Sequence, residues 1–393
     1  MTSTSADPPA LPGFDTALAN AIAACPSTHE TFDVPLDDAD GMVLARTIIA
    51  DRDVPPFNRA QMDGYALRHA EYTTTAPMDV VGMIAAGQPA DIRIPAGACI
   101  AIATGAPVPE DADTVVPHEW SDRGTPVRFT RPDVKRGHAI HPCGADARAG
   151  DVIVPDRTHL LPQHLALAAT VGLTRVTVIR PPRIIVLTSG DEVRPLGASV
   201  APHQIRNSNG ILIVRLVHRL GALSATHAHL PDDRQKTIDT VGHAIETADI
   251  VITIGGVSAG DRDFFPSAFE AHGIDMALRG AAIQPGKPIC IGRAPRGTIV
   301  IGLPGNPVSA LVTACLFAGP IIRQRRGDDP THTWRTLTLR EAVRTNAHRE
   351  VFRPGCAHED GTVTIPPWAG SGDLAHTAAT TGIIALPKSA EPI

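Results

Sequence analysis

Two acidic, glycine-rich motifs follow apolar runs that are typical of buried strands. GGVSAGDRD at residues 255–263 comes after the run 249–254, and SGDE at residues 189–192 comes after the run 183–188. Bare backbone amides in a tight turn form a concavity that binds anions. Carboxylates beside such a turn would repel an anion unless a cation lay between them. The two motifs therefore indicate a phosphate-like ligand that is bound together with a divalent cation.

Two more loops of the same kind follow closely along the chain, QPGKP at residues 284–288 and GLPGNP at residues 302–307. Lys287 is one of only four lysines, beside 31 arginines. A lysine kept between glycine and proline in such a chain indicates a site that needs a compact ammonium rather than a planar guanidinium. Asn306 and Pro307 have the residue types that begin a helix, as N-cap and first helical residue.

The elements that must position these loops alternate between strand and helix. We expect strands at 183–188, 249–254 and 298–303, and helices at 208–220, 237–247, 264–272 and 308–323. This alternation predicts a parallel sheet with helices on both faces. Ligands of such sheets bind beyond the carboxyl ends of the strands. The four glycine-rich loops are therefore expected to meet at one edge of the sheet.

Changes in composition along the chain predict a multidomain α/β plus β protein. A helix at 14–25 is expected to pack on the α/β domain at 177–328, and a β-rich domain at 49–145 looks inserted into another domain. The remaining segments predict a small linking α+β domain and a C-terminal β domain with short strands at 335–339, 350–353, 362–365 and 382–386. The expected boundaries are 1–26 for the N-terminal segment, 27–48 with 146–176 for the linking domain, and 329–393 for the short, barrel-like C-terminal domain.

Composition narrows the possible partners. The net charge is −6, no lysine or arginine block is present, and aromatic residues make up 4% of the chain. These values argue against nucleic acid as a partner. Six cysteines without a C-x-x-C motif are typical of reduced thiols, and 17 histidines fit no metal template. No signal peptide is recognised, and the near-apolar run 308–322 is too short for a bilayer, so we expect a cytoplasmic protein without a membrane partner.

Six motifs together resemble the molybdopterin molybdenumtransferase family, the family of MoeA and of the gephyrin E domain. Each motif alone is compatible with an ordinary turn, and the acidic residues at 261 and 263 with helix caps. Their order and approximate spacing match the family over roughly residues 14–386. The motifs are MDGYA at 62–66, TGAPVP at 104–109, SGDE at 189–192, GGVS at 255–258, PGKP at 285–288 and GLPGNP at 302–307.

The resemblance implies an L-shaped, four-domain homodimer in which residues 177–328 form a molybdopterin-binding domain. The active site would lie between this domain and the β-rich domain of the other subunit. The implied reaction inserts molybdate into adenylylated molybdopterin, releases AMP and yields the active molybdenum cofactor. It also implies a molybdopterin adenylyltransferase and molybdoenzyme clients as partners.

The resemblance also assigns residues. Asp63, Glu192, Asp263 and Lys287 would be catalytic, and Glu192, Asp232 and Asp263 would hold Mg²⁺, with Zn²⁺ as an alternative. Asp63, Thr104 and Asp146 would come from the partner subunit. The substrate-binding residues implied are Thr104, Asp146, Ser189, Gly190, Asp232, Gly255, Gly256, Ser258, Gln284, Gly286, Pro304, Gly305, Asn306 and Pro307.

Two departures from the family keep alternatives open. The family commonly has Lys-Pro-Gly-Lys, whereas Gln284 takes the first position here, so oxyanion affinity should fall unless an arginine such as Arg279 compensates. The chain also stops at Ile393, before a further strand that the family usually has. The alternatives are a molybdopterin adenylyltransferase, a catalytically idle pterin-binding scaffold, and a preference for tungstate over molybdate.

Overall fold

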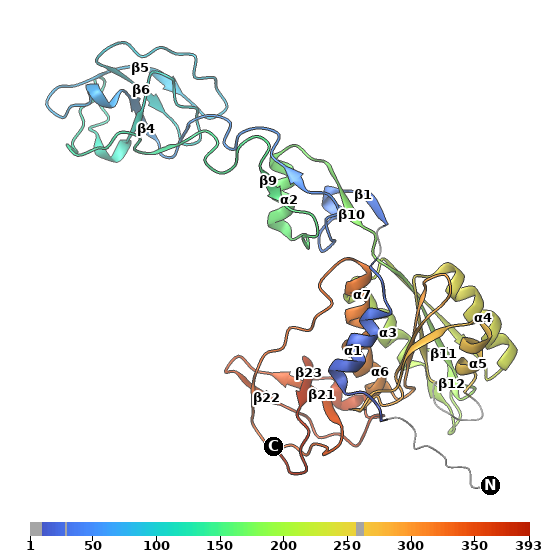
Figure 1. The fold of residues 1–393 in the computed structure, drawn as a ribbon. Helices are drawn as coiled ribbons and strands as arrows, with labels where there is room; N and C mark the ends of the chain where they lie inside the picture. Colours follow the sequence, from blue (N-terminus) through green and yellow to red (C-terminus); the bar gives the residue numbers. More distant parts are fainter. Residues whose placement is uncertain (1–9, 28–29, 257–262) are drawn as a thin grey trace, which may run out of the picture. The chain divides into compact units, whose positions relative to one another are not determined.

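The computed structural model describes residues 10–27, 30–256 and 263–393, which form two compact units (Figure 1). The first, called the α/β unit, contains residues 1–34, 41–45 and 177–393, and the second, called the β unit, contains residues 35–40 and 46–176.

The α/β unit is built on a six-stranded mixed sheet. Its four parallel strands are β14 (Ser224–Leu230), β11 (Arg183–Ser189), β15 (Ile250–Ile254) and β19 (Ile299–Leu303), in that order. The sheet continues antiparallel through β18 (Cys290–Arg293) and β16 (Asp275–Arg279). The prediction of an all-parallel sheet was therefore wrong at one end. The edge strands β14 and β16 expose many residues, so they lack the apolar run by which buried strands are recognised.

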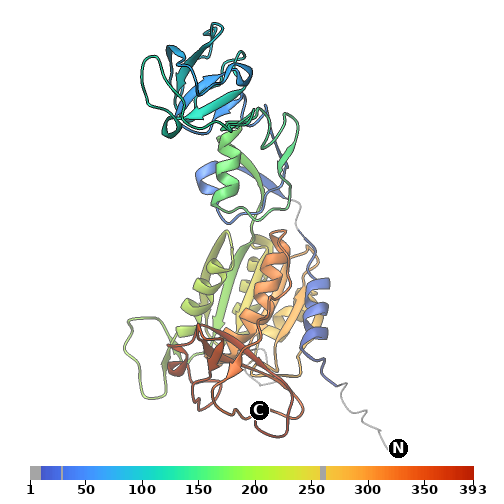
Figure 2. The ribbon, with the colours of Figure 1, turned by 90° about the vertical axis from the view of Figure 1, so that its left-hand side faces the viewer.

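Helices cover both faces of this sheet (Figures 1 and 2). The side chains of Ile250, Ile252 and Ile254 join one hydrophobic core, whereas that of Val251 joins the other. This alternation explains why β15 is apolar except at Thr253, since both of its faces are buried. Helices α1 (Phe14–Ala23), α3 (Ser208–Arg219), α6 (Pro307–Thr313) and α7 (Gly319–Arg325) contribute to the first core, and α4 (Arg234–Thr247) and α5 (Phe265–Ala271) to the second.

The helix expected at 308–323 is interrupted. A π-helical turn, Ala314–Ala318, lies between α6 and α7. Pro320 lacks the N–H that would bond to the carbonyl of Leu316, and that carbonyl instead accepts a hydrogen bond from His332 Nε2 at 2.9 Å. Among the described helices, the stretch Pro307–Arg325 is long and apolar enough to cross a bilayer, but 72% of its apolar window is buried inside the fold, as in a core helix.

The C-terminal strands form a small sheet that reaches the QPGKP loop. Strand β17 (Ile283–Gln284) pairs in parallel with β21 (Glu350–Ala357), opposite Glu350 and Val351. Strand β21 also pairs with β22 (Thr362–Thr364) and β23 (Gly382–Leu386), and β22 with β20 (Thr338–Leu339). All four strands expected in this region are therefore present.

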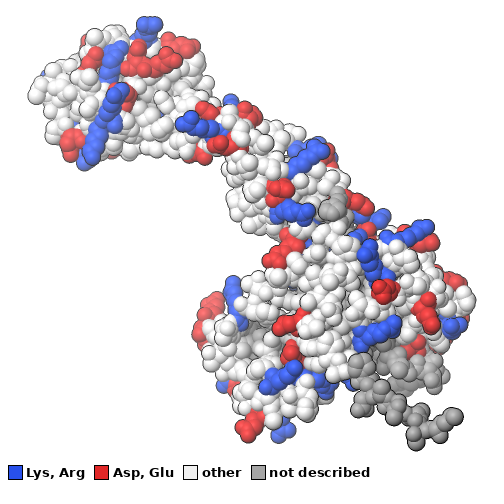
Figure 3. Space-filling model, viewed as in Figure 1, with Lys and Arg blue, Asp and Glu red and all other residues white. Residues whose placement is uncertain are grey.

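The β unit contains a four-stranded sheet in the order β5 (Asp79–Ile84), β6 (Ala98–Ile102), β4 (Gly64–Leu67) and β7 (Thr114–Pro117). The same unit contains helix α2 (Pro162–Thr170). On the faces seen in Figure 3, basic and acidic residues are interspersed over both units. The short strand pairs elsewhere are β1 (Thr31–Pro35) with β10 (Arg175–Ile179), β2 (Ile48–Ile49) with β9 (Val152–Val154), β3 (Arg59–Ala60) with β8 (Ile140–His141), and β12 (Val193–Arg194) with β13 (Ile205–Arg206).

Candidate active site

A cavity of about 910 Å³ opens beyond the carboxyl ends of β11, β15 and β19. The loops after all three strands line it, as expected for a sheet of this type. The predicted site residues that line it are Ser189, Gly190, Glu192, Asp232, Gly255, Gly256, Asp263, Pro304, Gly305, Asn306 and Pro307. Ser258, which was also predicted, lies outside the described residues, as does the acidic residue at 261.

Two helices begin at this cavity. Asn207 caps α3, because its Oδ1 accepts a hydrogen bond from the backbone N–H of Gly210 at 2.9 Å. Asn306 takes the N-cap position of α6, but its side chain makes no capping bond and its Nδ2 donates to Ser371 Oγ at 2.9 Å. The predicted positions of Asn306 as N-cap and Pro307 as first helical residue are therefore confirmed, but the Asn306 side chain does not cap the helix. Helix N-termini and glycine amides at one cavity favour an anionic ligand such as a phosphate.

The charges facing the cavity are mostly acidic. Glu192, Asp232 and Asp263 line it, together with the one cation Arg206 among the described lining residues. Gly190 has a φ of +128°, and a Cβ there would fall 2.5 Å from Oε2 of Glu192. Glycine at this position therefore lets the Glu192 carboxylate lie against the turn.

The predicted metal ligands fit magnesium better than zinc. Within the described part of the chain, no three metal-binding side chains come close enough to hold an ion by themselves. Mg²⁺ is commonly held by one or two carboxylates together with substrate phosphates and waters. Glu192, Asp232 and Asp263 can supply the carboxylates. Zinc prefers histidine or cysteine, and neither occurs among the described lining residues.

A polar network centred on the buried Thr188 and Asn207 supports the cavity floor. Thr188 Oγ1 accepts a hydrogen bond from Asn207 Nδ2 at 2.8 Å, and it lies 2.9 Å from His227 Nε2 and 3.0 Å from His229 Nδ1. Burial lowers the pKa of His227, and the neighbouring His229 lowers it further. These two histidines therefore hold Thr188 and, through it, the cap of α3.

Asn209 is a cavity residue that the sequence analysis missed. Its Nδ2 donates to the carbonyl of Gly305 at 2.7 Å, which links α3 to the GLPGNP loop. Its Oδ1 is buried and has no hydrogen-bond partner in the described structure. This acceptor is available to a donor group of a ligand, because buried polar atoms in proteins are nearly always paired.

A second, smaller pocket of about 440 Å³ adjoins the cavity and shares Pro288, Pro304 and Asn306 with it. Its cations are Lys287 and Arg349, and the predicted site residues Gln284 and Gly286 also line it. Arg349 was missed, because it lies in the C-terminal segment, far from the glycine-rich motifs in sequence. Only the pairing of β17 with β21 brings this segment to the pocket.

Arg279, suggested as a compensating cation, lies elsewhere. It lines a separate cavity of about 1100 Å³ beside the edge strand β16, and it is not among the described residues lining the smaller pocket. Lys287 borders both spaces. The arginine that accompanies Lys287 in the smaller pocket is therefore Arg349.

The β unit has its own polar cluster. Asp63 Oδ1 accepts hydrogen bonds from the backbone N–H of Thr104 at 2.6 Å and from its hydroxyl at 2.8 Å. These bonds lower the pKa of Asp63, so the carboxylate is ionised at neutral pH. Asp146 pairs separately with His141, whose Nε2 lies 2.8 Å from Asp146 Oδ1. Asp63 and Thr104, which were both predicted as site residues, are therefore in direct contact.

The fold and cavity define a multidomain protein with a molybdopterin-binding α/β domain. Residues 185–324 match the family model described as "Probable molybdopterin binding domain", and residues 13–172 match "MoeA N-terminal region (domain I and II)". The chain belongs to the molybdopterin molybdenumtransferase family, whose members are transferases of molybdenum-cofactor biosynthesis. The resemblance drawn from the six motifs is confirmed.

Individual relatives support this membership over nearly the whole chain. Molybdopterin molybdenumtransferase 2 of Mycobacterium tuberculosis H37Rv is 32% identical over 90% of each protein. The molybdopterin molybdenumtransferase of a Nostoc species is 30% identical over 94% of this chain and 87% of its own. The crystal structure of the MoeA protein from Pyrococcus horikoshii superposes with a TM-score of 0.83 at 26% identity, covering 98% of this chain and 97% of that one.

Proposed function

We propose that this chain inserts molybdenum from molybdate into adenylylated molybdopterin and releases AMP. The main cavity binds the pyrophosphate of the pterin nucleotide, and the smaller pocket binds molybdate. Water cleaves the phosphoanhydride bond. The products are AMP and molybdopterin, which keeps its terminal phosphate. The two dithiolene sulfurs then bond to molybdenum, and the two thiol protons leave with one oxo group of molybdate as water. The protein acts in the cytoplasm, as its composition favours.

One observation carries this proposal: an acidic cavity with two helix N-termini adjoins a cationic pocket through three shared residues. The first space suits a phosphate ester that arrives with a divalent cation, and the second suits a small oxyanion. Two ligands in adjoining spaces are held close to each other, which is the main requirement of a transfer between them.

Separate sets of residues in the α/β unit bind the divalent cation, the phosphates and molybdate. Glu192, Asp232 and Asp263 would hold Mg²⁺ together with substrate phosphates and waters, and the ion would neutralise charge on the phosphates. The amides of Gly255 and Gly256, together with the start of α3, bind phosphate oxygens. Lys287 and Arg349 hold molybdate, with the Ser309 and Ser371 hydroxyls beside them.

Asp63, Thr104 and Asp146 complete the site from a second copy of the chain. Their own unit supplies a rigid, ionised carboxylate at Asp63, which Thr104 orients through two hydrogen bonds. A homodimer with two sites at its interface follows from this arrangement. A molybdopterin adenylyltransferase supplies the substrate, and molybdoenzymes receive the cofactor.

The test is anaerobic AMP release from adenylylated molybdopterin with Mg²⁺, with and without micromolar molybdate. We expect release to depend on molybdate. Glu192→Gln should abolish it, because that variant removes a carboxylate from the cavity, whereas the exposed α4 residue Glu246 can be changed to glutamine as a control without effect.

The outcomes separate the alternatives. ATP-dependent adenylylation of molybdopterin by the purified protein would replace the proposal with the adenylyltransferase. Tight binding of adenylylated molybdopterin without any AMP release would favour the idle scaffold. Release that depends on tungstate but not on molybdate would change the metal and leave the reaction in place.

A further inference from the structure

Gln284 stands where the family pattern has a lysine, and the structure gives this neutral side chain a specific partner. Its Oε1 accepts a hydrogen bond from Asn346 Nδ2 at 2.9 Å. Gln284 is half-buried and lines the smaller pocket, whereas Asn346 is not among the described residues that line it. Strand pairing of Gln284 with Val351 keeps the two segments together.

The orientation of the Asn346 amide is determined by the backbone. Its Oδ1 accepts hydrogen bonds from the N–H groups of His348 at 2.9 Å and of Arg349 at 3.1 Å. A backbone N–H can only donate, so the oxygen must face these two groups and Nδ2 must face Gln284. The same reasoning places Gln284 Oε1 toward Asn346 and leaves Nε2 as the end that Asn346 does not engage.

We propose that Asn346 is a positioning residue that turns the Gln284 amide so that its Nε2 donates to an oxyanion in the smaller pocket. The inference rests on the proposed function, in which this pocket binds molybdate. Lys287 and Arg349 then supply two positive charges for a doubly charged tetrahedral anion, and Gln284 supplies a neutral donor in place of a third cation. Asn346 links this donor to Arg349, because one side chain bonds to both.

This arrangement explains why a lysine at position 284 would not be an improvement by itself. An ammonium group cannot accept the hydrogen bond from Asn346 Nδ2, and Asn346 cannot reverse its amide without losing both backbone bonds. Gln284→Lys should therefore weaken molybdate binding unless Asn346 is also changed to aspartate, whose oxygens accept from the backbone and from the ammonium. The effects of the two substitutions should be strongly non-additive.

Asn346→Asp alone is the most informative variant. A carboxylate oxygen facing Gln284 Oε1 is repulsive, so the Gln284 amide reverses and presents its carbonyl oxygen to the anion. We expect the Kd for molybdate, measured by equilibrium dialysis of the full chain with molybdate alone, to rise about tenfold or more. The KM for molybdate in AMP release should rise likewise, while kcat at saturating molybdate changes by less than about twofold.

His348→Ala is the matched control, because it keeps the backbone N–H that Asn346 accepts and removes only an exposed side chain. Its Kd should equal that of the natural protein. Thermal unfolding of each variant shows whether the fold is intact, and Asn346→Ala gives a smaller loss of affinity if Asn346→Asp does not fold.

The two proposals fail in different ways. If the natural protein binds molybdate and Asn346→Asp binds it equally well, Asn346 does not position Gln284, while the proposed function stands. If His348→Ala loses as much affinity as Asn346→Asp, the effect is structural and the inference is overturned. If the natural protein neither binds molybdate nor releases AMP, the proposed function fails and takes the inference with it.

Discussion

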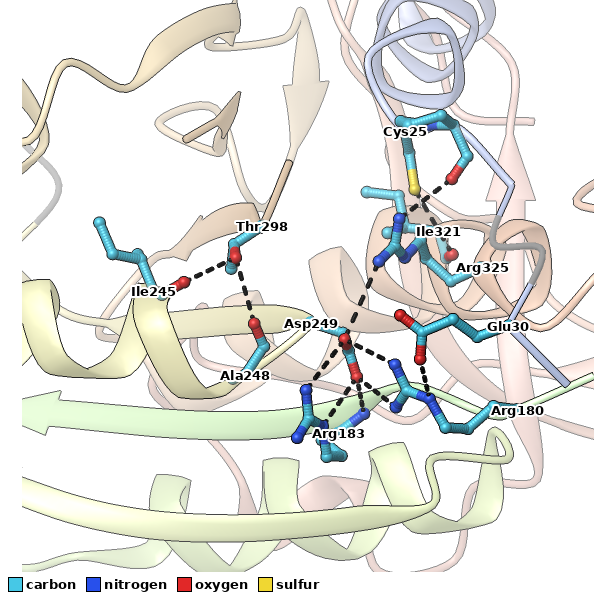
Figure 4. A network of polar contacts seen from close by, with 11 residues as sticks. Cys25, Glu30, Arg180, Arg183, Ile245, Ala248, Asp249, Thr298, Ile321 and Arg325 are labelled. Carbon is cyan, nitrogen blue, oxygen red and sulfur yellow. Dashed lines mark hydrogen bonds and ion pairs between the residues drawn. The ribbon is translucent and has the colours of Figure 1, made fainter. Parts of the chain in front are cut away.

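The carboxylate of Asp249 receives two hydrogen bonds from the guanidinium of Arg180, at 2.9 and 3.1 Å (Figure 4). Asp249 directly precedes β15, at the end of the sheet opposite the cavity. The backbone and side chain of Arg183 also donate to it, and Arg180 bonds to Glu30 at 2.6 Å. This ion-pair network therefore stabilises the α/β unit away from the candidate site.

Asp249→Asn should destabilise the protein without changing molybdate affinity. Burial by itself would raise the pKa of Asp249, but the bonds from Arg180 and Arg183 outweigh burial and lower it to about 2. Because the pKa is lower in the folded state, the carboxylate contributes stability above pH 4, on the order of 2 kcal/mol, and this is lost as the pH falls toward 2. Urea unfolding at several pH values measures this loss.

Asp249→Asn should lose this part of the pH dependence of the free energy of unfolding, since asparagine does not titrate. The exposed Asp239 provides the comparison, and Asp239→Asn should leave the curve nearly unchanged. An Asp249→Asn protein that is as stable as the natural one at pH 7 would show that the network contributes nothing.

Gly286→Ala should destabilise the QPGKP loop. Gly286 has a φ of +105°, and a Cβ there would lie 2.2 Å from Cγ2 of the buried Thr313. The backbone strain and the collision together should cost about 2–4 kcal/mol in the free energy of unfolding and raise the KM for molybdate. Urea unfolding and AMP release measure the two effects.

Gly297→Ala separates the two causes of the stability loss expected for Gly286→Ala, which are backbone strain and the collision with Thr313. Gly297 has a similar φ of +96° in the same unit, but the nearest atom to a Cβ lies 3.7 Å away. That variant should show only the backbone cost, and adding Thr313→Ser to Gly286→Ala should recover part of the difference. Equal losses for the two glycine variants would mean that the contact with Thr313 has no effect.

Thr188→Val should weaken both the fold and nucleotide binding. Valine keeps the shape but removes the hydroxyl that joins Asn207 to His227, so the buried Asn207 amide loses a hydrogen-bond acceptor. The expected cost is about 1–3 kcal/mol, together with weaker AMP binding because Asn207 lines the cavity. Calorimetric titration with AMP measures the affinity.

Thr188→Ser retains the hydroxyl and should behave like the natural protein.

The pKa of His227 is lowered in the folded state, so as the pH falls the unfolded chain takes up a proton on this histidine before the folded chain does. Stability from this network is therefore full above the usual histidine pKa of about 6.5 and declines as the pH falls below it. Thr188→Ser with the same loss as Thr188→Val would exclude the hydroxyl as the cause.

Mixing two inactive variants should restore activity if the site spans two subunits. Asp63→Ala inactivates the β unit of one chain, and Glu192→Ala inactivates the α/β unit of the other. Each mixed dimer then has one intact site and one doubly defective site. Random reassociation should give roughly a quarter of the natural AMP release. A mixture that stays inactive although mixed dimers form would mean that each chain completes its own site.

The sequence by itself determined the family, the positions of the glycine-rich loops and three of the six strands of the α/β sheet. These features are local: an apolar run buried on both faces, a glycine that follows it and the order of six motifs can all be recognised without distant contacts. Asp63 with Thr104 followed from the same motifs, and the structure brings them together.

Only the tertiary structure decided which distant side chains complete the smaller pocket and the cavity floor. Gln284 and Asn346 are 62 positions apart, and their contact depends on the pairing of β17 with β21. The polar edge strand β14, which carries His227, has no apolar pattern that would have revealed it. Side-chain partners brought together by strand pairing leave no spacing in the sequence, so Arg349 and Asn346 could be found only in the folded chain.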